Sequence, residues 1–124
     1  MPRYYVYKTS FDDGMYYIGN HKSRRFRHDL LNDGYWGSGT AFKAKVIELW
    51  IEYWRNCDDP PSTDMERFLE GCKYDFTGAC LNADILGMTK EILQVFDNGV
   101  DSRKFEKETI KLFINDPMCL NMKL

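Results

Sequence analysis

The sequence predicts a small α/β domain of the α+β kind, in which a mainly antiparallel three-stranded sheet is flanked by helices. Aromatic and β-branched residues at 4–9 and 15–19 are separated by turn residues, as in a hairpin. A helical stripe of apolar residues runs from 40 to 55, and the apolar stretch 91–96 has the character of a strand. With 124 residues, 44% of them hydrophobic, the chain is most simply one domain that needs no disulfide or metal to fold.

The predicted hairpin turns at Phe11-Asp12-Asp13-Gly14, which suits a type I turn closed by a left-handed glycine. This three-residue loop places Tyr7 opposite Gly19. Because side chains alternate along a strand, the aromatic residues at 5, 7, 17 and 21 then share one face with Gly19. A two-residue loop at Asp13-Gly14 would put Tyr17 on the face opposite Tyr7. We favour the first register, since it gathers phenols, a glycine and an imidazole in one patch.

Apolar spacing and capping residues predict the helices. Thr40–Arg55 carries a stripe broad enough to be core rather than a partner surface. The capping box Thr63-x-x-Glu66 predicts a second helix from about Asp64 to Cys72. A last helix is expected at about Arg103–Ile114, with Asp101 or Ser102 as its cap and Phe105, Leu112 and Phe113 as its buried face. Leu120–Leu124 is expected to return as an edge strand, and His21–Asn32 to contain a short helical turn or two.

The charges are unevenly spread along the chain, although the net charge is only −2. Residues 1–49 carry eight basic and five acidic side chains, whereas residues 50–76 carry three basic and seven acidic. The basic excess lies beside the predicted tyrosine patch, which allows phosphate binding there without demanding it. The acidic stretch at about 56–88 is interpreted as an insert that lies away from DNA and serves stability or contact with a protein partner.

The cysteines and the N-terminus exclude several classes of protein. Cys57, Cys72, Cys80 and Cys119 include no C-x-x-C pair, so a zinc site is not expected. No apolar run approaches the ~20 residues of a membrane span, and Met1-Pro2-Arg3 begins no signal peptide. We therefore expect reduced thiols and a cytoplasmic protein that makes no membrane contact.

Two of these stretches resemble a known nuclease signature. Tyr5-Val6-Tyr7, followed ten residues later by Tyr17-Ile18-Gly19, resembles the paired signature of the GIY-YIG nuclease superfamily, with Tyr5 in place of its first glycine. The run Asp33–Gly39, DGYWGSG, is similar to small free-standing phage members related to homing endonucleases. The resemblance implies a GIY-YIG-like domain at 1–124 that hydrolyses DNA phosphodiester bonds with Mg²⁺ or another divalent cation. A phage-encoded member would act in the host cytoplasm.

The resemblance also assigns catalytic residues. Tyr7 and Tyr17 match the two signature tyrosines, and a histidine often stands in the phage members where His21 stands here. Arg27 follows Gly19 at the spacing of the superfamily's catalytic arginine, and Arg24 and Arg25 are alternatives. From the residues alone, a cross-strand packing pair is the favoured interpretation of the two tyrosines, and a solvated surface is the usual interpretation of the basic cluster.

The superfamily holds its single metal through a glutamate on a late helix, followed by a proline and then an asparagine. Glu108, Pro117 and Asn121 reproduce that order. Glu106 competes with Glu108, but the nine-residue gap from Glu108 to Pro117 is closer to the family pattern. We therefore expect that Glu108 is the catalytic metal ligand and that Glu108→Ala abolishes cleavage. Without such a role, Glu108 would be an ordinary rim residue reaching solvent.

The expected chemistry follows from the growing negative charge of a phosphodiester in its transition state. A metal on a carboxylate polarises the phosphoryl oxygen, a guanidinium binds the same phosphate, and a tyrosine orients or deprotonates the attacking water. The alternative function is an inactive, nuclease-derived binding protein that contacts a protein partner or nucleic acid. The residues expected to contact DNA are Lys22, Arg24, Arg25, Gly37, Ser38, Gly39 and Asn121.

Overall fold

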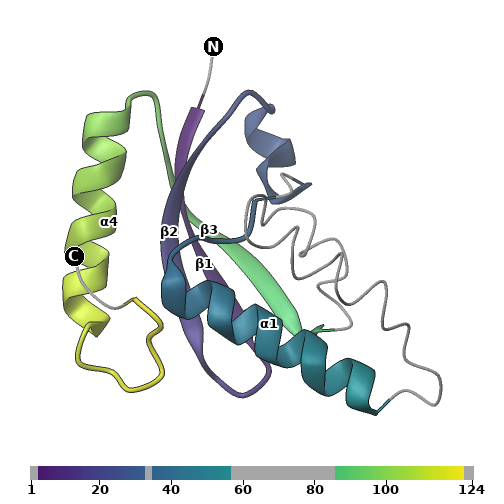
Figure 1. Ribbon diagram of the computed structural model, residues 1–124. Helices are drawn as coiled ribbons and strands as arrows, with labels where there is room; N and C mark the ends of the chain where they lie inside the picture. The colour runs from purple at the N-terminus through teal and green to yellow at the C-terminus, as the bar shows by residue number, and fades with distance from the viewer. Residues whose placement is uncertain (1–2, 33–34, 57–85, 122–124) are drawn as a thin grey trace.

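The computed structural model describes residues 3–32, 35–56 and 86–121 (Figure 1). Its elements, in chain order, are β1 (Arg3–Phe11), β2 (Tyr16–Ser23), the 3₁₀ helix η1 (Arg27–Asn32), α1 (Thr40–Arg55), β3 (Met88–Phe96) and α4 (Gly99–Phe113). Three antiparallel strands with flanking helices confirm the predicted fold class. The predicted helix from Asp64 to Cys72 lies outside the described residues, as does nearly all of the acidic insert.

The sheet has the strand order β2-β1-β3, so β2 is an edge strand. Tyr7 pairs with Gly19 and Thr9 with Tyr17, which confirms the predicted hairpin register. Gly14 has a φ of 91° and donates its N–H to the carbonyl oxygen of Phe11, as the turn chemistry requires. Both outer strands are longer than predicted, because β2 continues to Ser23 and β3 already begins at Met88.

β3 contains a bulge, which shifts its register against β1. Val6 pairs with Gln94 but Tyr7 pairs with Ile92, so Leu93 is the extra residue. The shift lets Ile92 and Val95 pack against Tyr5 and Tyr7 on one face of the sheet, while Leu93 packs on the other.

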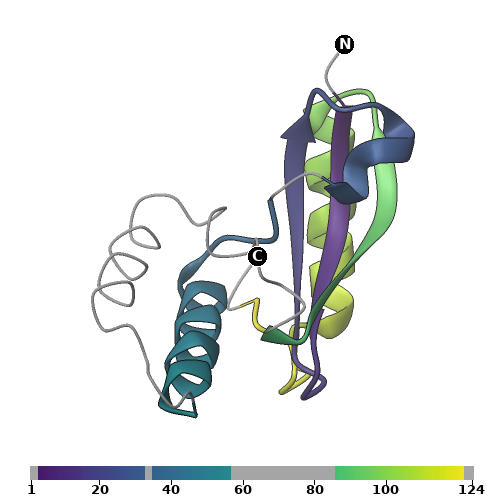
Figure 2. The same ribbon diagram turned by 90° about the vertical axis from the view of Figure 1, so that its right-hand side faces the viewer.

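α4 lies across one face of the sheet, whereas α1 lies beside the sheet at its hairpin end (Figure 2). α4 packs through Ile110 against Val6 and Ile18. On the other face, α1 packs its stripe of Phe42, Val46 and Trp50 against residues that include Phe11 and Met88 at the hairpin end. The bounds of α1 are those predicted, and its stripe is core. None of the helices within the described ranges is long and apolar enough to cross a membrane.

The last helix differs from its prediction in cap and orientation. It begins at Gly99, and its N-cap is Asn98, whose side chain accepts a hydrogen bond from the N–H of Asp101 at 2.9 Å. Asp101 and Ser102 therefore lie inside the helix. Ser102 is fully buried instead of capping, since its hydroxyl donates to Asn20 Oδ1 at 2.8 Å.

The predicted buried face of α4 is wrong at two positions. Leu112 is 79% exposed and Phe113 39%, whereas Ile110 is buried and Phe105 is only partly buried. The helix docks through a stripe centred on Ser102, Glu106 and Ile110, which recur every four residues.

The segment after α4 returns along the free edge of β2. Tyr16 and Cys119 form an isolated parallel bridge, and the N–H of Leu120 donates to the carbonyl of Tyr16 at 2.8 Å. This agrees with an edge pairing near the predicted place, although residues 122–124 lie outside the described ranges. Cys119 is a half-buried free thiol.

Candidate active site at the tyrosine face

One face of the sheet carries a cluster of aromatic rings, which we call the tyrosine face and define by Tyr5, Tyr7, Tyr17 and His21. The ring centroids of Tyr5 and Tyr7 are 5.7 Å apart, and those of Tyr7 and Tyr17 are 6.4 Å apart. Tyr5 and Tyr7 are both completely buried. Tyr7 and Tyr17 therefore project from the same face, as predicted from the turn.

Gly19 makes room for the phenol of Tyr7. A Cβ built on Gly19 would collide with the Tyr7 hydroxyl and lie 2.9 Å from Cε1 of Tyr17. The hydroxyl of Tyr7 is buried and has no hydrogen-bond partner among the residues that the structure describes. Since buried polar groups are nearly always paired, an unpaired one facing a strand edge marks a place where a ligand atom is expected.

The loop at residues 35–39 covers part of this face. The ring of Tyr35 stacks on the imidazole of His21 with a centroid distance of 3.8 Å and an angle of 5°, and it meets the ring of Tyr7 edge-on at 6.1 Å. Ser38 Oγ lies 3.2 Å from the hydroxyl of Tyr17. The loop thus contributes both an aromatic wall and a polar partner to the cluster.

Lys90 of β3 belongs to the tyrosine face and is absent from the sequence prediction. Its ammonium donates to the Tyr5 hydroxyl at 2.9 Å and to the Tyr35 carbonyl at 2.7 Å, and it lies 5.4 Å from the centroid of the Tyr7 ring. The sequence predicts that this strand begins at Glu91, three residues after the observed start at Met88. Extending its alternation back from Ile92 would have placed Lys90 on the same face.

Glu106 of α4 is the carboxylate whose charge acts on the tyrosines of the tyrosine face. It is preceded one turn earlier by Ser102, which binds Asn20, and followed one turn later by Ile110, which packs with Ile18. Glu106 therefore lies alongside β2 near the level of Gly19. Its charge raises the pKa of both phenols of the Tyr7 and Tyr17 pair. Glu106 makes no ion pair with any other described residue.

Burial controls the ionisation of this cluster. It raises the pKa of the Glu106 carboxyl above its ordinary value. Burial is also the main reason why the pKa of Tyr7 lies far above that of a free phenol, and neighbouring phenols add to it. The pKa of Tyr17 is raised chiefly by burial and lowered in part by its hydrogen bond to Ser38. Both tyrosines are accordingly neutral at pH 7 unless a cation binds next to them.

Glu108 does not lie with the tyrosines. It is exposed, and it stands about 200° around the helix axis from Glu106, because each residue turns an α-helix by about 100°. Glu108 lies off the packed face of the helix, because that face runs through Ile110 rather than Leu112. Of the two candidate metal ligands, Glu106 is the half-buried one on that face.

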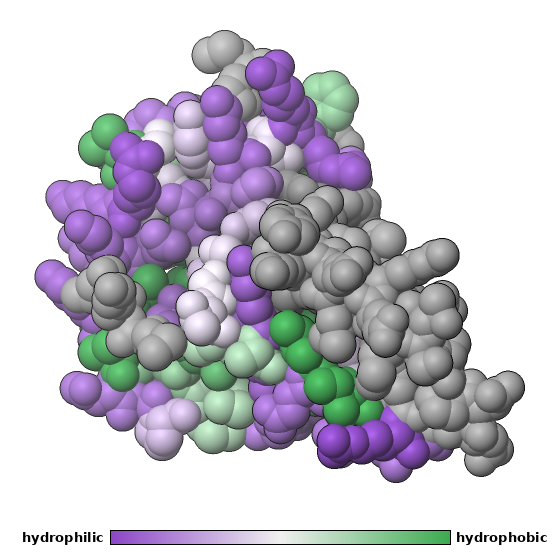
Figure 3. Space-filling view, in the orientation of Figure 1, coloured by the Kyte–Doolittle hydropathy of each residue, from purple (hydrophilic) through white to green (hydrophobic). Residues whose placement is uncertain are grey.

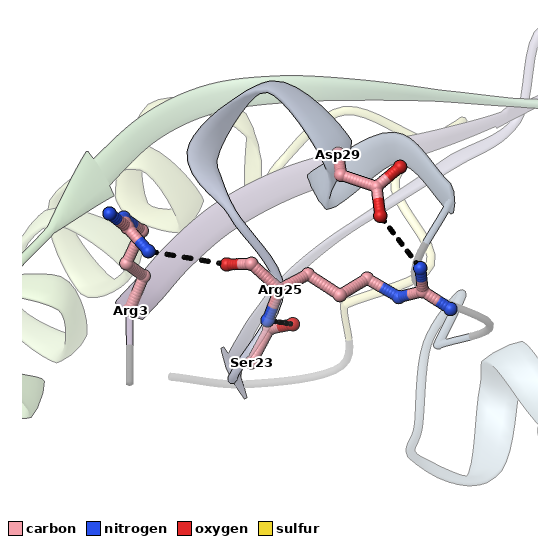
Figure 4. A network of polar contacts seen from close by, with 4 residues as sticks. All are labelled: Arg3, Ser23, Arg25 and Asp29. Atoms are coloured by element: carbon pink, nitrogen blue, oxygen red, sulfur yellow. Dashed lines mark hydrogen bonds and ion pairs between the residues drawn. The ribbon is translucent and has the colours of Figure 1, made fainter. Parts of the chain in front are cut away.

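The basic segment after β2 forms its own network (Figure 4). Arg25 Nη1 pairs with Asp29 at 2.8 Å, and its main-chain oxygen accepts from Arg3 at 3.4 Å. Arg24 and Lys22 are exposed, and the ammonium of Lys22 lies 5.8 Å from the ring centroid of Tyr4, away from the tyrosine face. Arg27 begins η1, but its side chain lies outside the description. In Figure 3, hydrophilic residues gather at this upper end of the sheet.

Asn121 is held against β2. Its Oδ1 accepts from the N–H of Ile18 at 2.9 Å, and its Nδ2 donates to the Ile18 carbonyl at 2.8 Å. Both ends of the amide are therefore used within the fold. Asn121 also borders a pocket of about 260 Å³, whose other lining residues are Tyr17, Ser38, Gly39, Thr40, Ala41, Phe42 and Leu120.

The donor set fits a metal ion that keeps most of its water. No group of three or more His, Cys, Asp or Glu side chains converges within the described part of the chain, so a fully protein-bound metal is not supported there. A single carboxylate at Glu106 with the unpaired Tyr7 hydroxyl nearby suits Mg²⁺, which usually binds one or two carboxylates plus water and substrate phosphate.

No family model, no curated protein and no solved structure matches the chain.

Proposed function

We propose that this protein is a divalent-metal-dependent endonuclease of the cytoplasm, which hydrolyses DNA phosphodiester bonds at the tyrosine face and resembles the GIY-YIG superfamily. The observation that carries the proposal is the close approach of Tyr7 and Tyr17 at Gly19, with Glu106 near enough for its charge to raise the pKa of both phenols. These groups come from β1, β2 and α4, so the fold and not a local motif brings them together. Of the two stretches that carry the resemblance, Tyr5, Tyr7, Tyr17 and Gly19 lie on the tyrosine face, whereas Val6 and Ile18 pack on the other face of the sheet.

Each side chain has a role that follows from its surroundings. Glu106 would hold Mg²⁺, which when bound supplies positive charge to the phosphoryl and leaving oxygens. Because burial has already raised its pKa, Glu106 gains from a cation that stabilises its ionised form. Tyr7 keeps a neutral hydroxyl with no protein partner, so it is able to bind the attacking water and orient it toward phosphorus.

Tyr17 has a different environment from Tyr7. Its hydroxyl shares a hydrogen bond with Ser38 at the mouth of the 260 Å³ pocket, where Gly39 begins the turn into α1. That arrangement supports phosphate binding by Tyr17, Ser38 and the glycine loop, with Tyr17 as a donor. His21 is stacked on Tyr35 and supports the wall of the site. Arg24, Arg25 and Arg27 remain the candidates for the arginine that binds the phosphate.

The proposal is tested with supercoiled plasmid, incubated with the purified protein in Mg²⁺ and in EDTA. We expect cleavage only with the metal, loss of cleavage in Glu106→Gln, and near-normal cleavage in the matched variant Glu108→Gln from the same helix. If the wild-type protein binds plasmid but leaves it intact with Mg²⁺ or Mn²⁺, the alternative function of an inactive binding protein replaces this proposal. If Glu108→Gln is the inactive variant, the metal site lies elsewhere on α4.

A further inference from the structure

Two polar side chains of the sheet hold the loop at residues 35–39 by its main chain. Thr9 of β1 and Lys90 of β3 are direct cross-strand partners. Lys90 Nζ donates to the carbonyl of Tyr35 at 2.7 Å, and Thr9 Oγ1 donates to the carbonyl of Trp36 at 2.6 Å. Consecutive peptide groups of the loop are thus fixed to one point of the sheet, and we call Thr9 and Lys90 the loop clamp.

The loop clamp sets the position of groups that touch the tyrosine face. Two residues beyond the second clamped carbonyl, Ser38 reaches the Tyr17 hydroxyl. On the other side, the ring of Tyr35 lies on His21 and against Tyr7. Release of the clamp would therefore change the surroundings of Tyr7 and Tyr17 without removing an atom from either.

Lys90 is placed to act through the loop rather than on a substrate. At least two of its three N–H donors are used, by Tyr35 and by the Tyr5 hydroxyl, and the ring centroid of Tyr5 lies 4.9 Å away. Tyr5 is itself completely buried. The ammonium of the half-buried Lys90 is consequently held among phenols beneath the loop, with its bonds directed to the protein.

We propose that Lys90, together with Thr9, is a positioning residue of the nuclease site, which holds the loop so that Ser38 and Tyr35 stay against the two catalytic tyrosines. This inference rests on the proposed function. It goes beyond that function by assigning a role to β3, which carries none of the residues that the resemblance assigns.

The position of the loop is measurable without any activity. The chain has only two histidines, His21 and His28, so the imidazole signals in NMR are assigned with one His28→Gln variant. Stacking on Tyr35 at 3.8 Å gives the His21 ring protons a ring-current shift. We expect that shift to be lost in Lys90→Met, which keeps the length of the side chain, and reduced in Thr9→Val, which keeps its shape.

Lys8→Met is the matched control. Lys8 lies next to Thr9 on β1, but its ammonium sits 4.6 Å from the ring centroid of Tyr16, on the opposite face of the sheet. The control therefore removes a lysine charge and a cation–ring contact of the same kind without touching the loop. We expect Lys8→Met to leave the His21 signals and the cleavage rate unchanged.

Cleavage kinetics then separate positioning from the other roles of a lysine. We expect Lys90→Met to lower kcat by about 10²-fold with KM within about twofold, as is typical when reacting groups are displaced by about 1 Å. Thr9→Val, which changes no charge, should lower kcat as well. If only Lys90→Met is affected, or if its KM rises while kcat holds, Lys90 acts by charge on the substrate and the positioning role is wrong.

The two measurements also keep the two proposals apart. If Lys90→Met and Thr9→Val leave the His21 signals unchanged, the loop clamp does not exist, whatever the nuclease assay gives. If the signals move but kcat equals that of Lys8→Met, the clamp is only structural. If the wild-type protein does not cleave DNA at all, the proposed function fails while the NMR result still decides whether Lys90 and Thr9 hold the loop.

Discussion

The hydroxyl of Tyr7 lies against the α-carbon of its cross-strand partner Gly19, in space that any side chain at position 19 would occupy. It is a buried polar group without a hydrogen-bond partner. Leaving such a group unpaired costs about 1–3 kcal/mol of folding free energy. Such a cost is expected to persist where the hydroxyl binds a ligand instead of stabilising the fold, and ligand binding is the role proposed for Tyr7.

Tyr7→Phe is therefore expected to separate stability from function. Removing the unpaired hydroxyl should leave the free energy of unfolding unchanged or raise it by up to about 1–3 kcal/mol, whereas DNA cleavage should be lost. Urea denaturation and the plasmid assay measure the two effects. Tyr16→Phe is the control, because the Tyr16 hydroxyl donates to Asp116 Oδ2 at 2.8 Å on the other face, so its loss should cost about 1 kcal/mol and leave cleavage intact. Equal destabilisation of both variants would contradict an unpaired Tyr7 hydroxyl.

Gly19→Ala tests the close approach between the Tyr7 hydroxyl and Gly19 by changing the glycine. The added methyl group would overlap the Tyr7 hydroxyl and press on the Tyr17 ring, so we expect a loss of about 1–3 kcal/mol in urea denaturation, as for overpacked cores. Gly99→Ala at the start of α4 is the comparison. A Cβ there would lie 3.0 Å from Nη1 of Arg103, the flexible end of an exposed side chain, and 3.1 Å from Cε1 of Tyr4. Both neighbours need give only a few tenths of an ångström, so the cost should be smaller than at Gly19. The idea fails if the two alanines cost the same.

The hairpin could be predicted because its determinants are local. The glycine at 14 and the two aspartates before it fix the loop length, and loop length fixes which residues of β1 and β2 share a face. The bounds of α1 were predictable for the same reason. In both elements the sequence pattern and the observed packing agree, so no distant contact had to be known.

The orientation of α4 could not be predicted, because it depends on contacts between distant parts of the chain. Glu106 and Glu108 lie among the same lysines, and both have apolar neighbours at helical spacing. What selects Glu106 is the burial of Ser102 against Asn20, which are 82 residues apart. The bulge at Leu93, which puts Ile92 and Val95 beside the tyrosines, likewise leaves no local signal in the sequence.

Glu106 should make stability depend on pH in a definite direction. Burial raises its pKa in the folded state above the ordinary value of 4.5, so the folded protein binds the proton more tightly than the unfolded chain does. This contribution to stability is present below pH 4.5 and is lost as pH rises through the higher folded pKa. The unfolding free energy of the wild-type protein, relative to that of Glu106→Gln, should therefore fall across that pH window.

Magnesium should stabilise the folded protein through the same residue at high pH, where Glu106 is ionised. If Glu106 holds the metal, adding Mg²⁺ at pH 8 should raise the thermal unfolding midpoint of the wild-type protein and not that of Glu106→Gln, since a ligand that binds only the folded state stabilises it. Differential scanning fluorimetry over a Mg²⁺ series measures this. An equal rise in both proteins would remove Glu106 from the metal site.

Asn121 offers the last test, which decides between a contact with DNA and a part in the fold. Its amide replaces a strand at the free edge of β2 by binding both the N–H and the carbonyl of Ile18, the residue between Tyr17 and Gly19. Asn121→Ala removes two hydrogen bonds, each of which contributes about 0.5–1.5 kcal/mol. The variant should therefore lower the free energy of unfolding by about 1–3 kcal/mol. Exchange of the Ile18 amide proton should accelerate in the same variant. Asn115→Ala, at an exposed position just after α4, should change stability by less than about 0.5 kcal/mol. If Asn121→Ala instead leaves stability unchanged and weakens DNA binding, the asparagine serves the nucleic acid directly, and its bonds to Ile18 are not what holds the C-terminal segment beside the catalytic tyrosines.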